Sequence, residues 1–389
     1  MNFGIICEFN PFHSGHKYLF DKARELGAKN IVCAMSGNSV QRGELAILDK
    51  YERAKFAILN GADLVLELPF PWSSGSAEYF ASAGVRALAP YCDAIIFGSE
   101  CGDIDLLKRA ADVALTSEFC AALDAKKKSG EGAASAYFSL IEEYVGARLS
   151  SNDILGVEYI KAAKKCGARL EFFTVKRMGN AYRDNTIREG EFPSASAIRK
   201  ALKSDDKLDF ERVQGFTDGS LKDALLQGQI TDADLIERAL LMYFRLADAS
   251  ELSQYAEADG GIAERICQAA KESRNIVELW EMIKNKRYTD AKLARAILFC
   301  LARVKRELLL QAPEYLYLLA ASESGRALLS SVKKSKSEGR IPVVTKPADV
   351  PRESAQFAAE ERLYAIFSLA RKNALPMSDY YRKNAFIIK

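Results

Sequence analysis

The residues best suited to chemistry lie in one short segment near the N terminus. The chain has only two histidines, His13 and His16, and both fall in the segment EFNPFHSGH, which spans residues 8–16. Two imidazoles in one turn can donate hydrogen bonds to phosphate oxygens and, when protonated, stabilise the charge that develops during displacement at phosphorus. Gly15 between them lets the backbone approach a ligand closely. The segment therefore predicts a phosphate-binding loop, with two incidental surface histidines as the alternative.

Metal and covalent chemistry fit the segment less well. Zinc-binding histidines on a helix are typically four residues apart, and no cysteine or carboxylate is placed to complete a site with His13 and His16. The eight cysteines are scattered without a CxxC pair, which argues against a zinc knuckle. No cysteine lies close in sequence to either histidine, so a Cys–His pair for acyl-enzyme chemistry is not indicated. We predict no metal site formed by the protein.

The elements predicted around the segment place it between a strand and a helix. Apolar runs predict strands at residues 4–8, 30–35, 62–68, 94–97 and 169–175, with helical patterns between them, including one at 103–127. Strands that are apolar throughout and alternate with helices are typical of a parallel sheet covered on both faces. In such a sheet ligands bind at βα turns, where the free N–H groups of a helix suit phosphate. We therefore predict an α/β, Rossmann-like fold.

The strand pattern fades after about residue 205. Amphipathic stretches at 232–248, 261–275, 276–286, 290–310 and 313–330 predict helices, followed by one short strand candidate at 341–345. A chain of 389 residues is also long for a single core. We predict two domains, a Rossmann-like catalytic domain at residues 1–210 and a mainly α-helical domain at residues 211–389.

The composition indicates an ordinary soluble protein. Hydrophobic residues make up 49% of the chain and charged residues 28%. No apolar run approaches the roughly 20 residues that span a bilayer, and no signal-peptide pattern precedes the first strand. Scattered cysteines suit a reducing compartment, so we expect a cytoplasmic location without a membrane partner. A net charge of +3 does not by itself predict a nucleic-acid partner.

The loop resembles the HxGH signature of the nucleotidyltransferase superfamily. The wider sequence resembles the bacterial tRNA(Met) cytidine acetate ligase family, through EFNPFHSGH, MSGNSVQRGELAILDK, GADLVLELP, IIFGSE, SNDILGVEYIKA, KRMG, SASAIRKAL and, more loosely, KRYTDAKLARAIL. The chain departs from the family pattern at four positions, where tyrosine, asparagine, an aromatic residue and proline are replaced by Phe9, Ser14, Ser39 and Leu45. None of these changes removes a polar group that we assign to chemistry, although Ser39 alters the shape of its loop.

The resemblance implies a two-step reaction. ATP, with Mg²⁺, and acetate would give acetyl-adenylate and pyrophosphate. The N4 amine of the wobble cytidine of elongator tRNA(Met) would then take the acetyl group and release AMP. Attack of acetate on the α-phosphorus requires positioning and charge neutralisation more than a covalent nucleophile, which suits the residues present. No stable protein partner is implied.

The resemblance also implies which residues surround the nucleotide, with His13, His16 and Arg177 as the catalytic residues. In the loop and the first helix these are Ile6, Cys7, Glu8, Phe9, Asn10, Pro11, Phe12, His13, Ser14, Gly15, His16, Lys17, Tyr18 and Leu19. Elsewhere they are Gly98, Asn152, Arg177, Met178, Ser194, Ser196 and Arg199. We assign Ser36, Gly37 and Asn38, after the second strand, to the acetate side.

Each of the outlying assignments has a structural alternative. Gly98 could be a plain turn glycine, and Arg177 a surface arginine. Asn152 precedes a helical pattern and could be its N-cap. The segment from Ser194 to Arg199 resembles a second phosphate loop but could be an ordinary capped helix.

Basic residues in the second half are candidates for RNA contact. They are Lys284, Lys286, Arg287, Lys292, Arg295, Lys333, Lys334 and Lys336, with Tyr288 interleaved as a residue that could stack on a base. The alternative is that each run is a solvated helix face. Two other functions stay open at this point, a small-molecule adenylyltransferase and an RNA-binding protein with an inactive nucleotide site.

Overall fold

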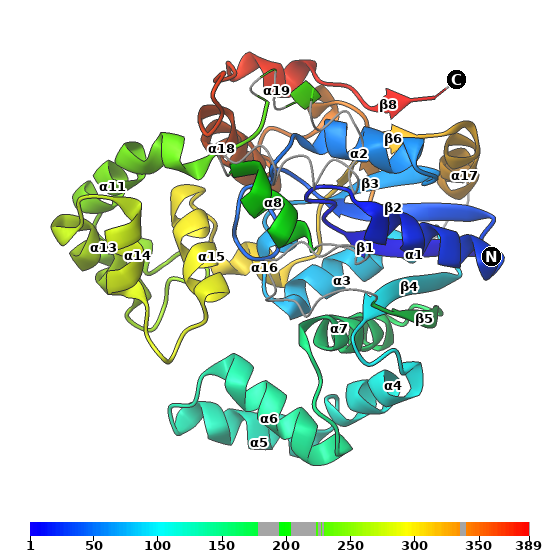
Figure 1. The fold of residues 1–389 in the computed structure, drawn as a ribbon, viewed down its shortest axis with the longest axis horizontal. Coiled ribbons are helices and arrows are strands. Elements are labelled where there is room, and N and C mark those ends of the chain that lie inside the picture. Colours follow the sequence, from blue (N-terminus) through cyan, green and yellow to red (C-terminus); the bar gives the residue numbers. More distant parts are fainter. Residues whose placement is uncertain (178–193, 204–222, 225–226, 228, 335–339, 389) are drawn as a thin grey trace.

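The computed structural model describes residues 1–177, 194–203, 223–224, 227, 229–334 and 340–388. Met178 and Lys336, two of the residues singled out above, lie outside these ranges. At the centre of the described part is one eight-stranded sheet (Figure 1). Its strands are β1 (Asn2–Cys7), β2 (Asn30–Ser36), β3 (Leu64–Leu68), β4 (Ala94–Ser99), β5 (Glu171–Lys176), β6 (Leu316–Ala321), β7 (Val343–Val344) and β8 (Phe386–Ile387).

The order of the strands reverses direction at the middle of the sheet, beside β1. The order is β5-β4-β1-β2-β3-β6-β7, and β8 also pairs with β6. The pairs among β1 to β5 are all parallel, which confirms the predicted parallel sheet. Since β1 pairs with both β2 and β4, the chain moves outward in opposite directions on its two sides. In open parallel sheets ligands bind at this reversal, outside the carboxyl ends of the strands.

Helices cover both faces of the sheet. On one face α1 (Ser14–Glu25) and α2 (Lys50–Leu59) bury residues such as Phe20 and Phe56. On the other face α3 (Ala77–Leu88), α7 (Ser151–Cys166) and α17 (Glu323–Lys334) do the same. Strands β2 and β3 are buried at every residue because both of their faces are covered, which explains why they are mostly apolar without alternation.

Three further helices connect β4 to α7 and form the lower part of Figure 1. They are α4 (Ile104–Val113), α5 (Ser117–Lys128) and α6 (Ala133–Val145). The prediction of one helix over residues 103–127 is therefore wrong. The chain breaks at Thr116, whose hydroxyl accepts a hydrogen bond from the Phe119 N–H at 3.2 Å and caps α5.

The second half forms a helical group at the left of Figure 1 and a set of elements that return to the sheet. The helical group comprises η2 (Ala233–Ile236), α11 (Glu237–Leu246), α12 (Ala249–Leu252), α13 (Ile262–Glu272), α14 (Ile276–Ile283) and α15 (Asp290–Leu301). These helices pack around a small core of their own, and α15 also reaches the main core through Leu298 and Phe299. The remaining helices are α16 (Arg306–Leu310), η3 (Pro347–Asp349), α18 (Ala355–Leu369) and α19 (Ser378–Arg382).

The predicted helix over residues 313–330 is wrong in its first half. Leu316–Ala321 is β6, which pairs antiparallel with β3 and is buried at every residue. An apolar run of this length can form either a helix or a strand. Here it forms a strand because it pairs with the edge of β3 that β2 leaves free. The predicted domain boundary at residue 210 stays a prediction. Strands β6, β7 and β8, which follow this boundary in the chain, belong to the same sheet as β1 to β5.

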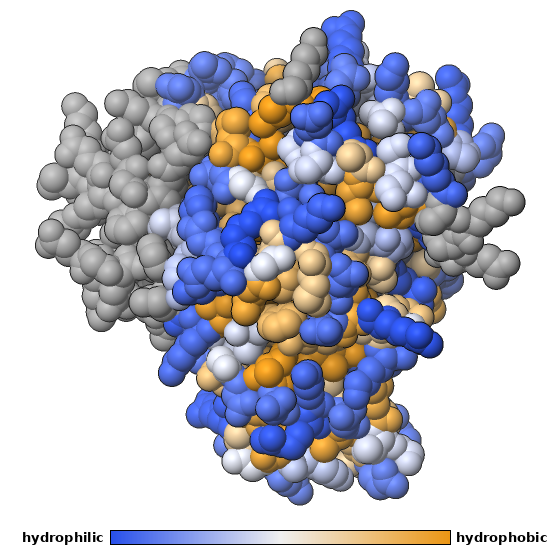
Figure 2. Space-filling model, turned by 90° about the vertical axis from the view of Figure 1, so that its right-hand side faces the viewer, coloured by the Kyte–Doolittle hydropathy of each residue, from blue (hydrophilic) through white to orange (hydrophobic). Residues whose placement is uncertain are grey.

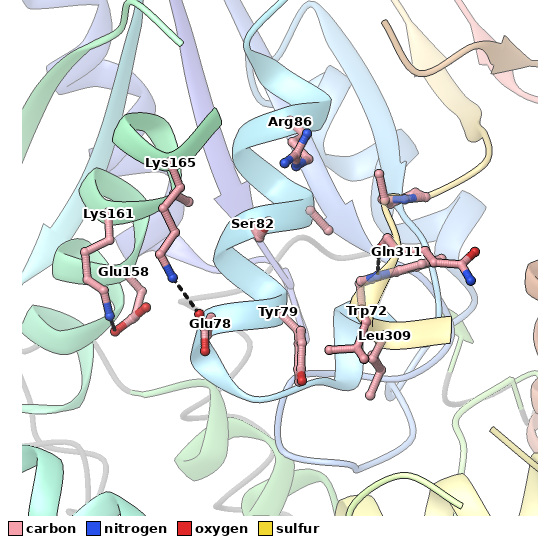
Figure 3. A pocket seen from close by; sticks show the side chains of 15 residues that line it. Trp72, Glu78, Tyr79, Ser82, Arg86, Glu158, Lys161, Lys165, Leu309 and Gln311 are labelled. Atoms are coloured by element: carbon pink, nitrogen blue, oxygen red, sulfur yellow. Dashed lines mark hydrogen bonds and ion pairs between the residues drawn. The ribbon is translucent and has the colours of Figure 1, made fainter. Parts of the chain in front are cut away.

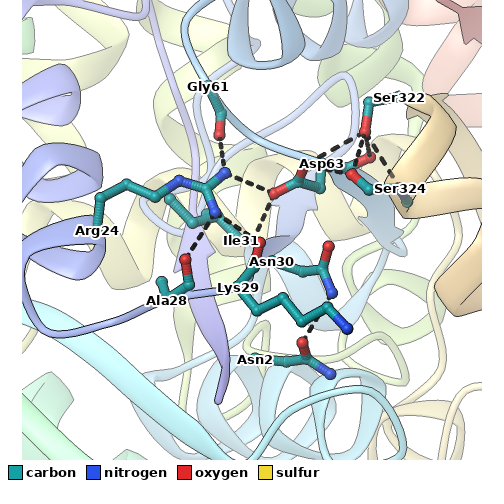
Figure 4. A network of polar contacts seen from close by, with 11 residues as sticks. Asn2, Arg24, Ala28, Lys29, Asn30, Ile31, Gly61, Asp63, Ser322 and Ser324 are labelled. Carbon is teal, nitrogen blue, oxygen red and sulfur yellow. Dashed lines mark hydrogen bonds and ion pairs between the residues drawn. The ribbon is translucent and has the colours of Figure 1, made fainter.

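A polar network joins β6 to the amino edge of the sheet, opposite the carboxyl ends of β1 and β4 (Figure 4). Asp63 accepts hydrogen bonds from the Arg24 guanidinium at 2.7 Å, the Ile31 N–H at 2.8 Å and the Ser324 hydroxyl at 2.6 Å. The Ser322 N–H donates to the Asp63 carbonyl at 2.9 Å. One carboxylate thus fixes the starts of β2 and β3 and the turn from β6 into α17.

The outer surface mixes polar and apolar residues. On the side where the N terminus lies, hydrophilic residues separate smaller hydrophobic patches (Figure 2). Within the described ranges, no helix is both long enough and apolar enough to cross a membrane.

Candidate active site

The loop that carries both histidines lies at the reversal point of the sheet. It leaves the carboxyl end of β1 at Glu8 and enters α1 at Ser14. The carboxyl end of β4 lies beside it, followed by that of β5, where Arg177 begins the next segment. The structure therefore brings the histidine loop, Gly98 of β4 and Arg177 after β5 to the same edge of the sheet.

The two imidazoles are held by backbone N–H groups at the start of α1. His13 is the N-cap, and its Nδ1 accepts a hydrogen bond from the Gly15 N–H at 3.1 Å. In return, His16 Nδ1 accepts a hydrogen bond from the His13 N–H at 3.2 Å. The rings stack with their centroids 3.8 Å apart. Since each Nδ1 is an acceptor, each neutral ring carries its proton on Nε2 and offers it as a donor.

Burial keeps both rings neutral in the free protein. It lowers the pKa of His13 to about 3, and the positive charge of Arg177 lowers it further in the same direction. The pKa of His16 also lies well below its usual range, because of burial, His13 and Arg177. The expectation that protonated imidazoles stabilise developing charge is corrected for the free protein, in which they act as neutral Nε2–H donors.

Aromatic rings fix the orientation of His16. The ring centroids of Phe9 and His16 are 4.9 Å apart in an edge-on arrangement, and those of Phe12 and His16 are 5.5 Å apart. Phe9 adopts a φ of 45°, in the left-handed region, and its ring is fully buried against Phe20. Such a backbone conformation is disfavoured for a bulky residue, so packing must hold it in place.

Two polar groups in the loop have no hydrogen-bond partner among the described residues. They are Asn10 Nδ2 and Ser14 Oγ, both buried. The other side of the Asn10 amide is engaged, since its Oδ1 accepts from the Ile47 N–H at 2.7 Å. Unpaired buried polar groups cost free energy, so these two are candidates for contact with a polar ligand. Gly15 has a structural reason too, because a Cβ there would lie 2.9 Å from His13 Cε1.

The remaining residues assigned to the loop have mostly structural contacts. Ile6 and Cys7 lie in β1 with their side chains in the cores on the two faces of the sheet. Lys17 pairs with Asp21 on the exposed side of α1. Glu8 accepts from the Gln41 N–H at 2.9 Å through its carboxylate, and burial raises the pKa of this carboxyl.

Gly98, Asn152 and Arg177 come together around a residue that the sequence reasoning missed. Glu100 Oε1 accepts a hydrogen bond from Asn152 Nδ2 at 2.6 Å and lies 4.0 Å from Arg177 Nε. A Cβ at Gly98 would lie 3.2 Å from Arg177 Cγ, so glycine leaves room for that side chain. Asn152 is not the N-cap of α7, because Ser150 occupies that position. The only indication of Glu100 in the sequence is its place in the stretch FGSE, which resembles the family pattern.

Ser194, Ser196 and Arg199 lie at the start of α8 (Ala195–Lys203), beside the histidine loop. Ser194 caps this helix, since its hydroxyl accepts from the Ala197 N–H at 3.1 Å. Arg199 donates to the Asn10 carbonyl at 2.9 Å and to the Glu44 carboxylate at 3.1 Å. The segment is thus both a capped helix and a support for the loop.

The segment after β2 is anchored by a buried arginine that the sequence reasoning also missed. Arg53 is fully buried and donates to the carbonyls of Leu48, Glu8, Ser36 and Gly37. Burial lowers its pKa to about 10. It thereby joins the segment that follows β1 to the one that follows β2.

The residues assigned to the acetate side lie next to a buried ion pair. Lys50 Nζ and Glu67 Oε2 are 2.6 Å apart. Asn38 Oδ1 accepts from the Lys50 N–H at 3.0 Å, and a Cβ at Gly37 would lie 2.2 Å from Glu67 Oε1. The Ser36 hydroxyl is buried without a partner among the described residues.

A polar cavity between α3, α7 and residues 309–313 is separate from this site (Figure 3). It is lined by none of the residues assigned above. Its charged groups largely satisfy one another, with Lys165 paired to Glu78 at 2.8 Å and Lys161 to Glu158 at 2.7 Å. We assign it no role in the reaction.

The basic residues expected to bind RNA do not form one cluster. Arg295 is buried and pairs with Glu257 at 3.2 Å, and Lys292 pairs with the same carboxylate at 3.3 Å. Arg295 is therefore corrected from an RNA contact to a structural residue. Lys333 and Lys334 end α17, on the opposite side of the molecule from α14 in Figure 1.

Comparison with known proteins finds relatives that cover nearly the whole chain. A family model described as HIGH Nucleotidyl Transferase matches residues 1–380. The chain is 35% identical to the tRNA(Met) cytidine acetate ligase of Caldanaerobacter subterraneus, over 97% of this chain and 98% of the relative. It is 33% identical to the enzyme of the same name from Syntrophotalea carbinolica, over 97% and 89%.

The chain belongs to the tRNA(Met) cytidine acetate ligase family. Crystal structures of Thermotoga maritima TmcAL have the same fold over the full length of both chains. The apo form gives a TM-score of 0.89 at 29% identity, and the form bound with alpha-thio ATP gives 0.86 at 28%. The resemblance and the fold class inferred from the sequence are both confirmed.

The neutral state of His13 in this family member has a consequence for stability. In the unfolded chain the imidazole titrates near pH 6.5, whereas in the folded chain its pKa is about 3. Between these values the unfolded state binds more protons, so stability falls as the pH falls. The His13 contribution to this loss should be about 2 kcal/mol between pH 7 and pH 5.

Replacing His13 with Asn keeps a helix-capping side chain and removes this titration. We expect the free energy of unfolding of His13→Asn to change less between pH 7 and pH 5 than that of the wild type, as measured by urea denaturation. The substitution Lys22→Ala, at a half-buried position on the same helix, should retain the wild-type dependence. An unchanged pH dependence in His13→Asn would contradict the neutral assignment.

Proposed function

We propose that this chain is an ATP-dependent ligase that activates acetate as acetyl-adenylate and acetylates N4 of the wobble cytidine of elongator tRNA(Met). Pyrophosphate leaves in the first step and AMP in the second. The observation that carries the proposal is the pair of Nε2–H donors at the N terminus of α1, placed at the reversal point of a parallel sheet. Family membership supports the choice of acyl acceptor.

Activation of acetate needs ATP to lie across the crevice between β1 and β4. Its phosphates would meet the N terminus of α1, whose free N–H groups and partial positive charge favour anions. His13 and His16 would donate from Nε2 to the α-phosphate, and Arg177 would offset charge there. Neutral donors in a buried site need little reorganisation as charge develops, which suits displacement at phosphorus.

Magnesium would enter with the nucleotide. In the described part of the chain, no group of three His, Cys, Asp or Glu residues is arranged to hold a metal ion. Mg²⁺ keeps several of its waters and commonly binds through substrate phosphates. The polyphosphate of ATP would therefore supply most of its ligands other than water. Acetate would approach from the side of Ser36, Gly37 and Asn38.

Removing either imidazole should nearly abolish adenylate formation. One donor of this kind is typically worth about 10²- to 10³-fold in rate. We expect His13→Ala and His16→Ala each to lose at least about 100-fold in acetate-dependent ATP–pyrophosphate exchange, with Lys22→Ala unaffected. Thermal unfolding verifies that each variant is folded. Exchange within a few-fold of wild type in either variant would contradict the role of that histidine.

Acetate should be used directly. The proposed chemistry cleaves between the α- and β-phosphates, so incubation with ATP, labelled acetate and tRNA should yield AMP, pyrophosphate and acetylated cytidine. Chromatography of the nucleotides and of the hydrolysed tRNA measures all three. Formation of ADP, or strict dependence on acetyl-CoA, would contradict the mechanism.

RNA contact is best supported at Lys286 and Arg287, after α14. Both side chains are exposed, and neither has an acidic partner in the ranges that the structure describes. By contrast Lys292, Arg295 and Arg306 are all paired with Glu257 or Asp259. Unpaired cations are free to neutralise phosphates, and each such contact steepens the salt dependence of binding.

The double variant K286E/R287E should therefore raise the Kd for tRNA and reduce the slope of log Kd against log salt by about 1–2. Acetate-dependent exchange without tRNA should not change. The matched control K108E/R109E makes the same change of charge at exposed positions of α4. Equal tRNA affinity and salt slope for the two double variants would show that Lys286 and Arg287 are merely solvated.

A further inference from the structure

Glu100 holds a buried carboxylate oxygen that nothing in the described part of the chain satisfies. Its Oε1 accepts from Asn152 Nδ2 at 2.6 Å, but its Oε2 is buried without a hydrogen-bond partner. Arg177 does not fill this role, since its Nε lies 4.0 Å away on the Oε1 side. An unpaired, buried, charged oxygen is costly, and such groups in a native fold call for an explanation.

The surroundings of Glu100 indicate a ligand rather than a structural partner. Glu100 follows β4 directly, at the reversal point of the sheet where β1 and β4 lie side by side. Arg177 lies near Glu100 and also acts electrostatically on His13 and His16. The carboxylate therefore belongs to the same site as the histidine loop, on the β4 side of it.

We propose that Glu100 is a specificity residue for the nucleoside half of ATP, and that its Oε2 accepts a hydrogen bond from this half. The inference rests on the proposed function, because it requires ATP in the crevice. The carboxylate would repel the phosphates, which places it at the other end of the nucleotide. Asn152 then acts as a positioning residue that holds Oε1 and so orients Oε2.

The chemistry limits the ligand atoms to a small set. An ionised carboxylate can only accept hydrogen bonds. The donors in the nucleoside half of ATP are the ribose 2′-hydroxyl, the ribose 3′-hydroxyl and the N6 amine of adenine. Three analogues each lack one of them: 2′-deoxy-ATP, 3′-deoxy-ATP and purine riboside triphosphate.

The test measures the Kd of ATP and of these three analogues by calorimetry, for the wild type and for Glu100→Gln, without acetate or tRNA. Glutamine has the same shape but presents an NH₂ donor or a weaker acceptor. We expect Glu100→Gln to weaken ATP binding about 10- to 100-fold. One analogue should bind the wild type about as weakly as ATP binds Glu100→Gln. The affinity of that analogue should fall by less than about 3-fold between the wild type and Glu100→Gln, because the interaction is already absent.

Several outcomes would overturn the proposal. One is that the losses of affinity caused by Glu100→Gln and by each of the three analogues are fully additive. Another needs no variant at all: a wild type that binds all three analogues as tightly as ATP. The control Glu143→Gln, at an exposed position of α6, should behave as wild type. Failure of the wild type to bind ATP would instead count against the proposed function, so the two failures are distinguishable.

Discussion

Two hydrogen bonds from backbone N–H groups to the imidazoles at the start of α1 determine how the histidines can act. The first N–H groups of a helix have no partner within the helix, and here Nδ1 of each imidazole meets one of them or the N–H of the cap itself. This arrangement satisfies the helix end and fixes both tautomers in one step. The rings are also buried at this position, which keeps them neutral, and their remaining protons lie on Nε2. The cap and the chemistry are one feature.

A buried guanidinium sets the place of this cap relative to the rest of the site. Arg53 has carbonyl groups around it rather than a carboxylate, so its charge is stabilised by backbone dipoles from Glu8, Ser36 and Gly37. Glu8 follows β1, Ser36 is the last residue of β2, and Gly37 follows it. Breaking their contacts would leave a buried charge uncompensated, which is strongly unfavourable. The core helix α2 thus controls the geometry of two functional segments at once.

The sequence was sufficient where the signal is local and failed where it depends on distant partners. The strands β1 to β5 could be predicted because each is a short apolar run, and the histidine loop because both histidines fall in one turn. Strand β6 is equally apolar, but its sequence predicts a helix, because only its pairing with β3 favours a strand. Glu100 was missed because its meaning comes from Asn152, 52 residues away. Arg295 was misread because the acidic group that neutralises it, Glu257, lies outside its helix.

NMR of ¹⁵N-histidine-labelled protein tests directly whether both rings of the free protein are neutral Nε2–H donors. The chain has only His13 and His16, so the spectrum contains two imidazoles and no others. Correlations between ring nitrogens and ring protons distinguish the two neutral tautomers and the cation. We expect both rings to be neutral at pH 7 with the proton on Nε2, and an ATP analogue to shift both Nε2 signals. A proton on Nδ1 of either ring, or a cationic ring in the free protein, would contradict this expectation.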